Sequence, residues 1–153
     1  MAITDKQCPW PPEYTSMRVA PVSETVQSEL LHVAQQATEP KGAVLFRRNE
    51  PAFGIFLVRK GSVSLRLEAE EEDPFWERIV TGDSIVGLPA TLSGGRYSLT
   101  AIVLEDSELA FVERSVLLDL IRNNPAIGLE LMRALSEEVV QMRNVLVSTP
   151  RAT

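Results

Sequence analysis

Hydrophobic and polar residues alternate through the middle of the chain, between residues 42 and 113. The clearest alternation is Ser-Val-Ser-Leu-Arg-Leu at 62–67, and further short runs rich in Val, Ile, Leu and Phe follow at 75–80 and 98–113. Turn-forming stretches such as "RKGS" and "TGD" separate these runs. A period of two predicts β-strands. Short strands at this regular spacing indicate an antiparallel sandwich or barrel rather than a parallel sheet.

A helical pattern precedes the strands. Ser23 is a typical N-cap residue, and hydrophobic residues recur after it at helical spacing. The members of this stripe are Val26, Leu30, Val33, Ala34 and Ala37. They predict an N-terminal helix packed on the β-region. His32, the only histidine, projects away from the stripe and is expected in solvent.

A second helical region, residues 115–147, follows the strands. Ser115 begins a short helix with the sequence "SVLLDLIRNN". Asn124 is the expected cap of a longer helix, and Pro125 stands at its favoured first position. Within the longer helix, Leu131, Leu135, Val139, Met142 and Leu146 follow at steps of four, four, three and four.

The last three of these steps match a coiled-coil seam. Such a seam on a terminal helix can pack against its own β-domain or against the same helix of a second chain. We therefore expect a homodimer whose seam consists of Leu135, Val139, Met142 and Leu146.

The composition and net charge of the chain limit the classes of protein to which it can belong. The chain has 153 residues, 44% of them hydrophobic, and carries a formal net charge of −6. This predicts one globular domain, residues 23–147, after a proline-rich arm, residues 1–22. The acidic balance argues against direct DNA binding, which needs clustered Lys and Arg. The longest apolar runs, such as "GIFLV", fall far short of the roughly 20 residues of a membrane span, and a single Cys8 without a signal peptide predicts a cytoplasmic protein.

One stretch holds candidate chemistry. Residues 84–101, "SIVGLPATLSGGRYSLTA", are rich in glycine and hydroxyl side chains, and Arg96 is their only charged residue. Arginine suits an anion because its planar fork donates charge-assisted hydrogen bonds. The stretch is either an anion-binding loop or a plain turn between strands.

The runs "VRKGSVSL", "TGDSIVG" and "IRNNPAIGLELM" resemble the cyclic-nucleotide-binding domain of the catabolite-activator and fumarate–nitrate-reductase regulator family. The resemblance runs from about Ser23 to Leu146. It implies a mainly β fold: a jelly-roll-like β-roll, or double-stranded β-helix, over about 42–113, between an N-terminal helix and a long C-terminal helix. In the family, glycines at the positions of Gly61 and Gly82 turn hairpins, and the long helix closes the ligand pocket and forms the dimer seam.

The resemblance assigns the stretch at 84–101 to the phosphate-binding cassette. The family uses a glutamate for the ribose hydroxyl, an arginine for the cyclic phosphate, and small residues with inward N–H groups. The ligand-binding residues implied here are Val86, Gly87, Leu88, Pro89, Ala90, Arg96, Tyr97, Ser98, Thr100 and Met142.

This cassette departs from the family pattern. Gly87 stands where the ribose glutamate is expected, and Asp83 matches the turn aspartate instead. Counting back from "LEDSEL" places Tyr97, rather than Arg96, at the position of the arginine. Counting on from "NNP" places Met142 and Arg143 where the cyclic-AMP receptor branch carries hydroxyls. Loss of the carboxylate alone would weaken nucleotide binding about ten- to a hundred-fold.

We therefore expect a ligand-sensing regulatory domain with a degenerate cassette, signalling through its C-terminal helix. A cyclic nucleotide, cyclic AMP or cyclic GMP, and another small molecule both remain open as the ligand. The alternative is a ligand-free dimerisation or protein-interaction module on the same fold.

Other classes are disfavoured. The sequence after the long helix leaves no room for a helix-turn-helix domain, so a stand-alone sensor is expected. One cysteine cannot hold an iron–sulfur cluster, and one histidine outside the barrel can supply neither a cupin metal site nor a nucleophilic triad. No catalytic residue, metal or obligatory cofactor is expected, and the chain is not expected to be an enzyme.

Overall fold

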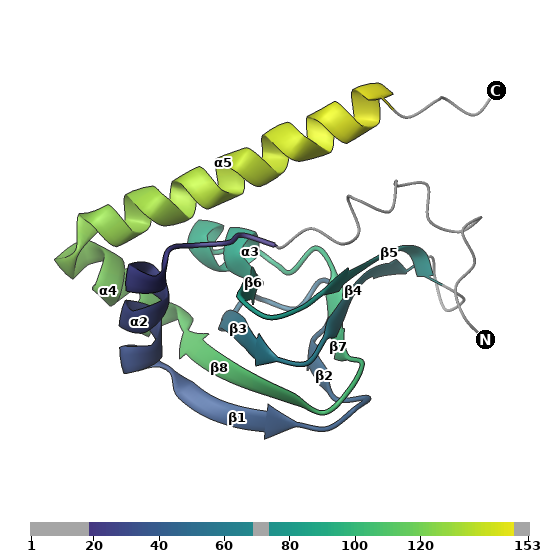
Figure 1. The fold of residues 1–153 in the computed structure, drawn as a ribbon, viewed down its shortest axis with the longest axis horizontal. Helices are drawn as coiled ribbons and strands as arrows, with labels where there is room; N and C mark the ends of the chain where they lie inside the picture. Colours follow the sequence, from purple (N-terminus) through teal and green to yellow (C-terminus); the bar gives the residue numbers. More distant parts are fainter. Residues whose placement is uncertain (1–18, 69–73, 149–153) are drawn as a thin grey trace.

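The computed structural model describes residues 19–68 and 74–148. Two four-stranded antiparallel sheets form a β-roll (Figure 1). In spatial order, one sheet contains β1 (Gln35–Glu39), β8 (Ser107–Glu113), β3 (Gly54–Lys60) and β6 (Ser84–Val86). The other contains β2 (Val44–Phe46), β7 (Thr100–Val103), β4 (Val63–Glu68) and β5 (Pro74–Val80). The predicted jelly-roll-like fold with flanking helices is confirmed.

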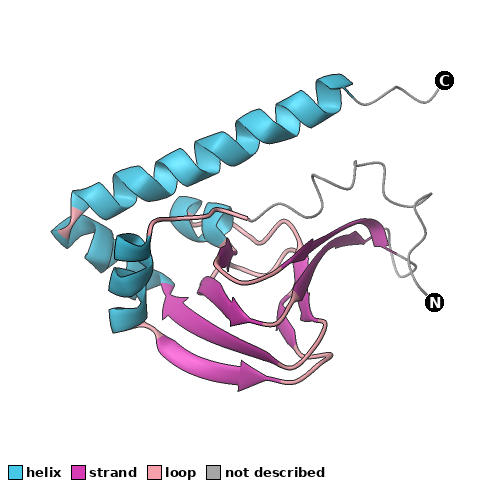
Figure 2. Ribbon diagram, in the orientation of Figure 1, coloured by secondary structure: helices cyan, strands magenta, loops and turns pink. Residues whose placement is uncertain are grey.

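Four described helices lie along one side and one end of the β-roll, as the separation of cyan and magenta in Figure 2 shows. They are α2 (Glu24–Val33), α3 (Leu88–Ser93), α4 (Arg114–Asn123) and α5 (Pro125–Ser148). The longest, α5, begins beside α4 and runs along the top of the view, above the roll (Figure 1). It begins at Pro125, as the sequence predicts. None of the described helices is long and apolar enough to span a bilayer.

Hydrophobic residues at alternate positions build the core between the two sheets. Val63 and Leu65 of β4 point inward and are almost fully buried. Ser64, on the predicted polar face, is also buried, because its hydroxyl donates to the Glu77 carboxylate and accepts from Arg66 Nε. Arg66 Nε and Glu77 Oε2 lie 3.1 Å apart. Ser64, Arg66 and Glu77 therefore form a polar cluster on the face of the β4–β5 hairpin that points away from the core, and this face is only partly exposed to water.

The first helix is shorter than its hydrophobic stripe predicts. Ser23 caps it, since its side chain accepts from the Val26 N–H. The helix ends at Val33, however, and Ala34 takes an extended conformation. Ala37 lies in β1 opposite Leu109 of β8. Residues 35–39 therefore pair with the sheet edge, and the β-region begins before residue 42.

The end of the predicted N-terminal arm belongs to the packed domain. Val19 and Ala20 are both buried, at 7% and 0% exposure. The Val19 carbonyl accepts from the Ile85 N–H, and its own N–H donates to Ser84 Oγ at 3.1 Å. No periodic pattern predicts this packing, because the segment is held by two hydrogen bonds of the Val19 backbone. Residues 1–18 of the arm, and residues 69–73 of the acidic hairpin loop, lie outside the described part of the chain.

Two turns of the β-roll use different residues for the same backbone task. Gly61 has a φ of 99°, which favours glycine. At the second turn Asp83, not the preceding Gly82, takes the positive φ, at 69°. Aspartate tolerates this region better than most side chains. The Asp83 N–H donates to the Val58 carbonyl across the turn, which fixes the start of β6.

Candidate functional site

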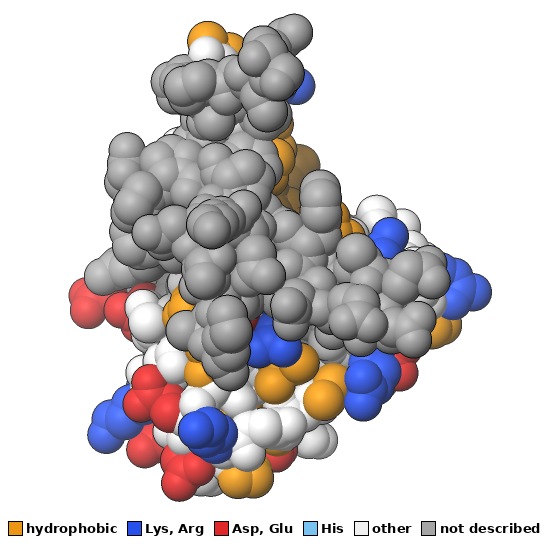
Figure 3. All heavy atoms as spheres, turned by 90° about the vertical axis from the view of Figure 1, so that its right-hand side faces the viewer, with side chains coloured by type: hydrophobic (Ala, Val, Ile, Leu, Met, Phe, Trp, Pro, Cys, Tyr) orange, Lys and Arg blue, Asp and Glu red, His pale blue; other side chains and the backbone are white. Residues whose placement is uncertain are grey.

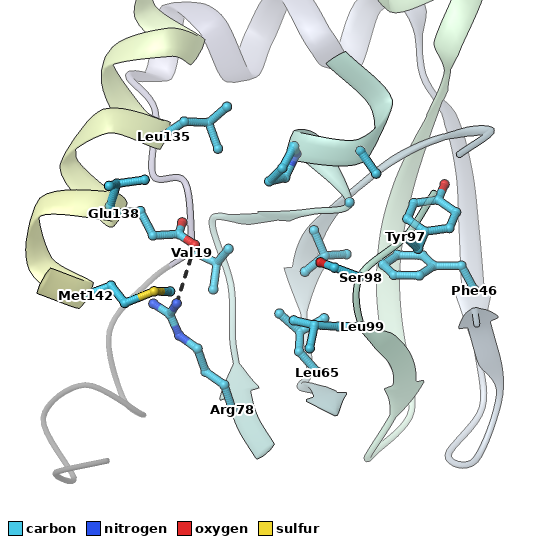
Figure 4. Close-up of a pocket in the computed structure, with 15 residues that line it drawn as sticks. Val19, Phe46, Leu65, Arg78, Tyr97, Ser98, Leu99, Leu135, Glu138 and Met142 are labelled. Carbon is cyan, nitrogen blue, oxygen red and sulfur yellow. Dashed lines mark ion pairs between the residues drawn. The ribbon is translucent and has the colours of Figure 1, made fainter. Parts of the chain in front are cut away.

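A cavity of about 380 Å³ lies between the β-roll and α5. Both sheets, the helices α3 and α5, and the segment that precedes α2 all contribute to it (Figure 4). Its lining residues are Val19, Phe46, Leu65, Arg78, Val86, Gly87, Pro89, Ala90, Tyr97, Ser98, Leu99, Leu135, Glu138, Val139 and Met142. Most of these side chains are apolar, and the size is typical of a small-molecule site.

The apolar end of the cavity is formed by stacked rings. Phe46 and Tyr97 lie with ring centroids 3.8 Å apart and planes 14° from parallel. Phe53 meets Tyr97 edge-on, with centroids 5.3 Å apart. In Figure 4 the Phe46–Tyr97 pair lies opposite α5, with Ser98, Leu99 and Leu65 between. A ligand reaching this end would contact ring carbon.

The Tyr97 hydroxyl has no hydrogen-bonding capacity left for a ligand. It donates to the Gly54 carbonyl at 2.6 Å and accepts from the N–H groups of Phe53 and Gly54, each at 3.1 Å. A phenolic hydroxyl has one donor and two lone pairs, so these three bonds satisfy it. Tyr97 is 2% exposed and ties the end of the cassette to the start of β3.

The opposite end of the cavity is charged. Arg78 of β5 is 2% exposed, and its Nη1 lies 3.6 Å from Oε1 of Glu138 on α5. The two side chains point toward one another across the gap between the roll and the helix (Figure 4). Oε2 of Glu138 accepts from the Ala20 N–H at 3.1 Å. Burial raises the pKa of the Glu138 carboxyl above its usual range, although Arg78 and the Ala20 N–H both act to lower it.

Gly87 opens the cassette helix, and no larger residue fits there without strain. Its φ is 87°, in the region that favours glycine. A Cβ at this position would lie 3.1 Å from the Tyr97 ring and 3.2 Å from the Gly54 carbonyl. α3 follows directly, and Thr91 Oγ1 donates to the same Gly54 carbonyl at 2.9 Å. The packing of Tyr97 therefore also disfavours a glutamate at position 87.

Arg96 points away from the cavity. It is exposed, and its Nη1 donates to the Asn49 carbonyl at 2.7 Å. Its backbone forms an isolated antiparallel bridge with Pro51. Arg96 thus fastens the loop between β2 and β3 to the end of the cassette and does not line the cavity.

A model of the family described as cyclic nucleotide-binding domain matches residues 38–124. The chain belongs to the cyclic nucleotide-binding domain family. The resemblance inferred from the sequence is therefore confirmed. The family is one of regulatory rather than catalytic domains.

Solved structures of regulators share the fold of this cyclic nucleotide-binding domain. The catabolite activator protein of Thermus thermophilus is 24% identical, with a TM-score of 0.69 over 81% of this chain and 58% of that one. The sensor domain of the transcriptional regulator DNR from Pseudomonas aeruginosa is 22% identical, with a TM-score of 0.63 over 80% of this chain and 82% of that one. The c-di-GMP responsive global regulator CLP of Xanthomonas campestris is 20% identical, with a TM-score of 0.63 over 83% and 61% of the two chains.

These likenesses show the fold alone. The chain spans 58% of the length of the Thermus protein. A search of curated proteins finds no significant sequence match.

The structure brings together most of the residues that the sequence places in the ligand site. Those that line the cavity are Val86, Gly87, Pro89, Ala90, Tyr97, Ser98 and Met142. Leu88 is instead fully buried in the core. Thr100, 3% exposed, accepts from the Arg48 N–H at 3.0 Å and, like Arg96, is not among the lining residues.

Sequence reasoning missed both charged residues of the site, Arg78 and Glu138, and also four apolar lining residues: Val19, Phe46, Leu65 and Leu99. Arg78 lies on the inward face of β5, the same face as Val80. At that position the period-two pattern predicts a hydrophobic residue. That interruption was the available signal. Glu138 had none, because charged residues are common along the exposed faces of long helices.

The predicted seam on α5 divides between two environments. All three described members line the cavity, but Leu135 also packs against the core, whereas Val139 and Met142 remain 46% and 36% exposed. The side chain of Leu146 lies outside the described part of the structure. Large apolar side chains exposed on α5 are Leu129, Met132, Val139, Val140, Met142 and Val147.

The described residues, 19–68 and 74–148, contain no candidate metal site. No group of three or more His, Cys, Asp or Glu side chains there could hold a metal ion. On the face drawn in Figure 3, the described basic and acidic side chains are interspersed over the β-roll and form no continuous basic patch.

Proposed function

We propose that this domain senses a small molecule bound in the cavity and passes the signal through α5. The observation that carries the proposal is the origin of the lining: Leu135, Glu138, Val139 and Met142 all come from one 24-residue helix. A ligand held between this helix and the β-roll contacts both bodies. Its binding energy can therefore bias how the helix sits on the roll, which is the requirement for a ligand-driven switch.

The proposed ligand site differs from a standard nucleotide cassette. Position 87 carries no carboxylate for a ribose hydroxyl, Tyr97 fills the expected place of the arginine with a ring, and Arg96 bonds the Asn49 carbonyl. A cyclic phosphate on α3 would lack its counter-charge, which is costly in a buried site. We expect cyclic AMP and cyclic GMP to bind at least about a hundred-fold more weakly than to a complete cassette.

The cavity is tested by filling it. Octan-1-ol serves as an apolar probe, and the Met142 methyl signal in NMR spectra reports its binding beside α5. Ala90→Phe places a ring in the cavity and should abolish the shift of this signal. Ser93→Phe, an exposed position on the same short helix, is the control and should leave it.

Cyclic AMP and cyclic GMP are titrated in the same way. Absence of a Met142 shift with the alcohol and with both nucleotides would contradict a ligand site between the roll and α5. A tight cyclic-nucleotide complex would support sensing but contradict the view that this cassette has lost its phosphate site.

A second proposal is that α5 joins two copies of the chain. Leu129, Met132, Val140 and Val147 are 48%, 57%, 53% and 87% exposed on one helix. Such a row of apolar side chains is typical of a helix that packs against a partner. This seam differs from the predicted one, because Leu135, Val139 and Met142 line the cavity beside the roll.

Light scattering tests the dimer. Met132→Asp with Val140→Asp should reduce the molecular mass to that of one chain, because two charges cannot be buried unpaired in a helical seam. Glu137→Asp, at an exposed position of the same helix, should leave the mass unchanged. A dimer that survives the double substitution would refute this seam.

A further inference from the structure

The Arg78–Glu138 pair is an unusual feature for the wall of an apolar cavity. Arg78 is 2% exposed, and the Nη1–Oε1 distance of 3.6 Å exceeds hydrogen-bond range. A guanidinium has five N–H donors in a planar fork that fits a carboxylate with two parallel bonds. Glu138 does not meet Arg78 in that geometry here: its Oε1 stays at 3.6 Å from Nη1, and its Oε2 accepts from the Ala20 N–H at 3.1 Å.

We propose that the ligand is a carboxylate with an apolar body, and that its carboxylate takes the place of Glu138 at Arg78. This inference rests on the proposed function of the cavity as a ligand site. Arg78 is the basic side chain among the lining residues, so it determines where a negative charge can be held.

The remainder of the cavity selects an apolar body. From Arg78 the lining continues along Leu65 and Leu99 to the stacked rings of Phe46 and Tyr97 (Figure 4). The Tyr97 hydroxyl is already satisfied by Gly54 and the Phe53 N–H. Ser98 is the other polar side chain that lines this part of the cavity. A ligand with several polar groups at its far end would therefore leave most of them without partners after losing their water, which disfavours sugars and nucleobases.

Ligand entry must displace Glu138. Two carboxylates beside one guanidinium repel each other, so Glu138 turns away from Arg78 toward solvent. A Glu138 that turns away also leaves the Ala20 N–H. Binding at Arg78 is thereby coupled to the contact between α5 and the segment before α2, which gives the site a defined output.

The experiment compares octanoate with octan-1-ol, which share the apolar chain and differ in the charged group. Affinities are measured by NMR titration, with the Ala20 amide proton as a local reporter. Octanoate should bind about ten- to a hundred-fold more tightly than the alcohol, as a charge-assisted pair implies. Octanoate, and not the alcohol, should move the Ala20 amide proton upfield as its carboxylate partner departs.

Variants separate recognition from folding. Glu138→Gln removes the internal competitor and should tighten octanoate binding by about ten-fold, whereas Glu137→Gln, the same charge change at an exposed neighbour, should not. Arg78→Met with Glu138→Leu replaces the buried pair by apolar side chains, a change that buried ion pairs often tolerate. This double variant should bind the two probes equally, and Arg96→Ala should retain the preference for octanoate.

Three other outcomes would contradict the proposal, each at a different point. Equal affinity for both probes in the natural chain, or a preference for octanoate that persists in the double variant, refutes recognition at Arg78 and leaves a purely apolar ligand site. Binding of neither probe refutes the apolar carboxylate as the ligand class, and absence of binding by cyclic AMP and cyclic GMP as well refutes the ligand site itself. Tighter binding of cyclic AMP than of octanoate refutes the apolar carboxylate as the ligand class.

Discussion

Tyr97 changes the chemistry of the whole cassette. The resemblance to the family places an anion-binding arginine at this position, but here a ring stacks on Phe46 and a hydroxyl bonds Gly54. The same ring lies against Gly87, so one side chain both removes a positive charge and limits the residue opposite. The cavity's buried positive charge is supplied instead by Arg78 of β5.

Removal of the Tyr97 hydroxyl should destabilise the protein without opening the site. Tyr97→Phe leaves the buried N–H groups of Phe53 and Gly54 without their acceptor. We expect a loss of about 1–3 kcal/mol in the free energy of unfolding, measured with urea. Ser98→Ala, at an exposed neighbour, should change it by less than about 0.5 kcal/mol. Equal effects of the two substitutions would show that the hydroxyl is not structural.

Glu138 should make stability depend on pH in the direction opposite to a normal salt-bridged carboxylate. Burial raises its pKa in the folded state above the ordinary value of about 4.3. Between the unfolded and folded pKa values the folded chain therefore binds more protons, so stability falls as pH rises through this window. Arg78 from β5 and the Ala20 N–H face the carboxyl and reduce the shift without reversing it.

Urea unfolding of the natural chain and of Glu138→Gln, at several pH values from 4 to 7, isolates this carboxyl, because contributions common to both proteins cancel. The difference in unfolding free energy, natural chain minus variant, should decrease as pH rises. A difference that increases with pH would mean that Arg78 lowers the Glu138 pKa more than burial raises it.

At the scale of elements, helices and strands with a regular hydrophobic pattern could be predicted. The point at which a helix gives way to a strand with a distant partner could not. The strands that lie within residues 42–68, 75–80 and 98–113, and the start of α5 at Pro125, follow from periodicity and cap chemistry. β1 and β6 do not. The stripe of the first helix runs past its true end because residues 35–39 gain cross-strand hydrogen bonds to β8, a partner more than sixty residues away in sequence. No local signal reports that gain.

The site was predictable only in part for a related reason. The cassette residues adjoin one another in sequence and could be found by motif. Arg78, Phe46 and Val19 reach the cavity from three other segments, and only the tertiary fold brings them together. The outward direction of Arg96 depends on the Asn49 carbonyl in another loop.

The β3–β4 turn should depend on Gly61 for two separable reasons. Gly61 has a φ of 99°, and a Cβ there would lie 2.0 Å from Ser107 Oγ. Gly42 has a similar φ of 92°, but a Cβ would meet nothing within 4 Å. Gly42→Ala should therefore cost about 1–2 kcal/mol through backbone strain alone. Gly61→Ala should cost at least about 2 kcal/mol more in urea unfolding, because Ser107 must also move; similar losses would exclude the steric contribution.

At the scale of the whole molecule, two glutamates of α5 hold the first described residues in place. Glu138 accepts from the Ala20 N–H, and Glu130 accepts from both the N–H and the hydroxyl of Ser23 at 2.5 and 3.0 Å. Ser23 is also the cap of α2. The long helix is therefore connected to the β-roll and to the N-terminal segment at once.

Loss of Glu130 should loosen this connection measurably. Glu130→Ala removes two hydrogen bonds to Ser23 and should lower the unfolding free energy by about 1 kcal/mol. It should also speed amide hydrogen exchange at Ser23 more than in β3. Glu137→Ala, an exposed position with the same charge, is the control. Unchanged exchange at Ser23 would show that Glu130 does not hold the segment.

These contacts also bear on the order in which the chain can fold during synthesis. The bonds from Ala20 and Ser23 to α5 join residues 118 and 107 positions apart. Contacts of such large sequence separation form late, and a chain made from its N-terminus cannot form them before α5 exists. Val19 can bond Ser84 and Ile85 as soon as β6 has been made. Ala20 and Ser23 gain their partners only after α5 has been made, so the wall of the cavity between this segment and α5 is among the last parts of the molecule to form.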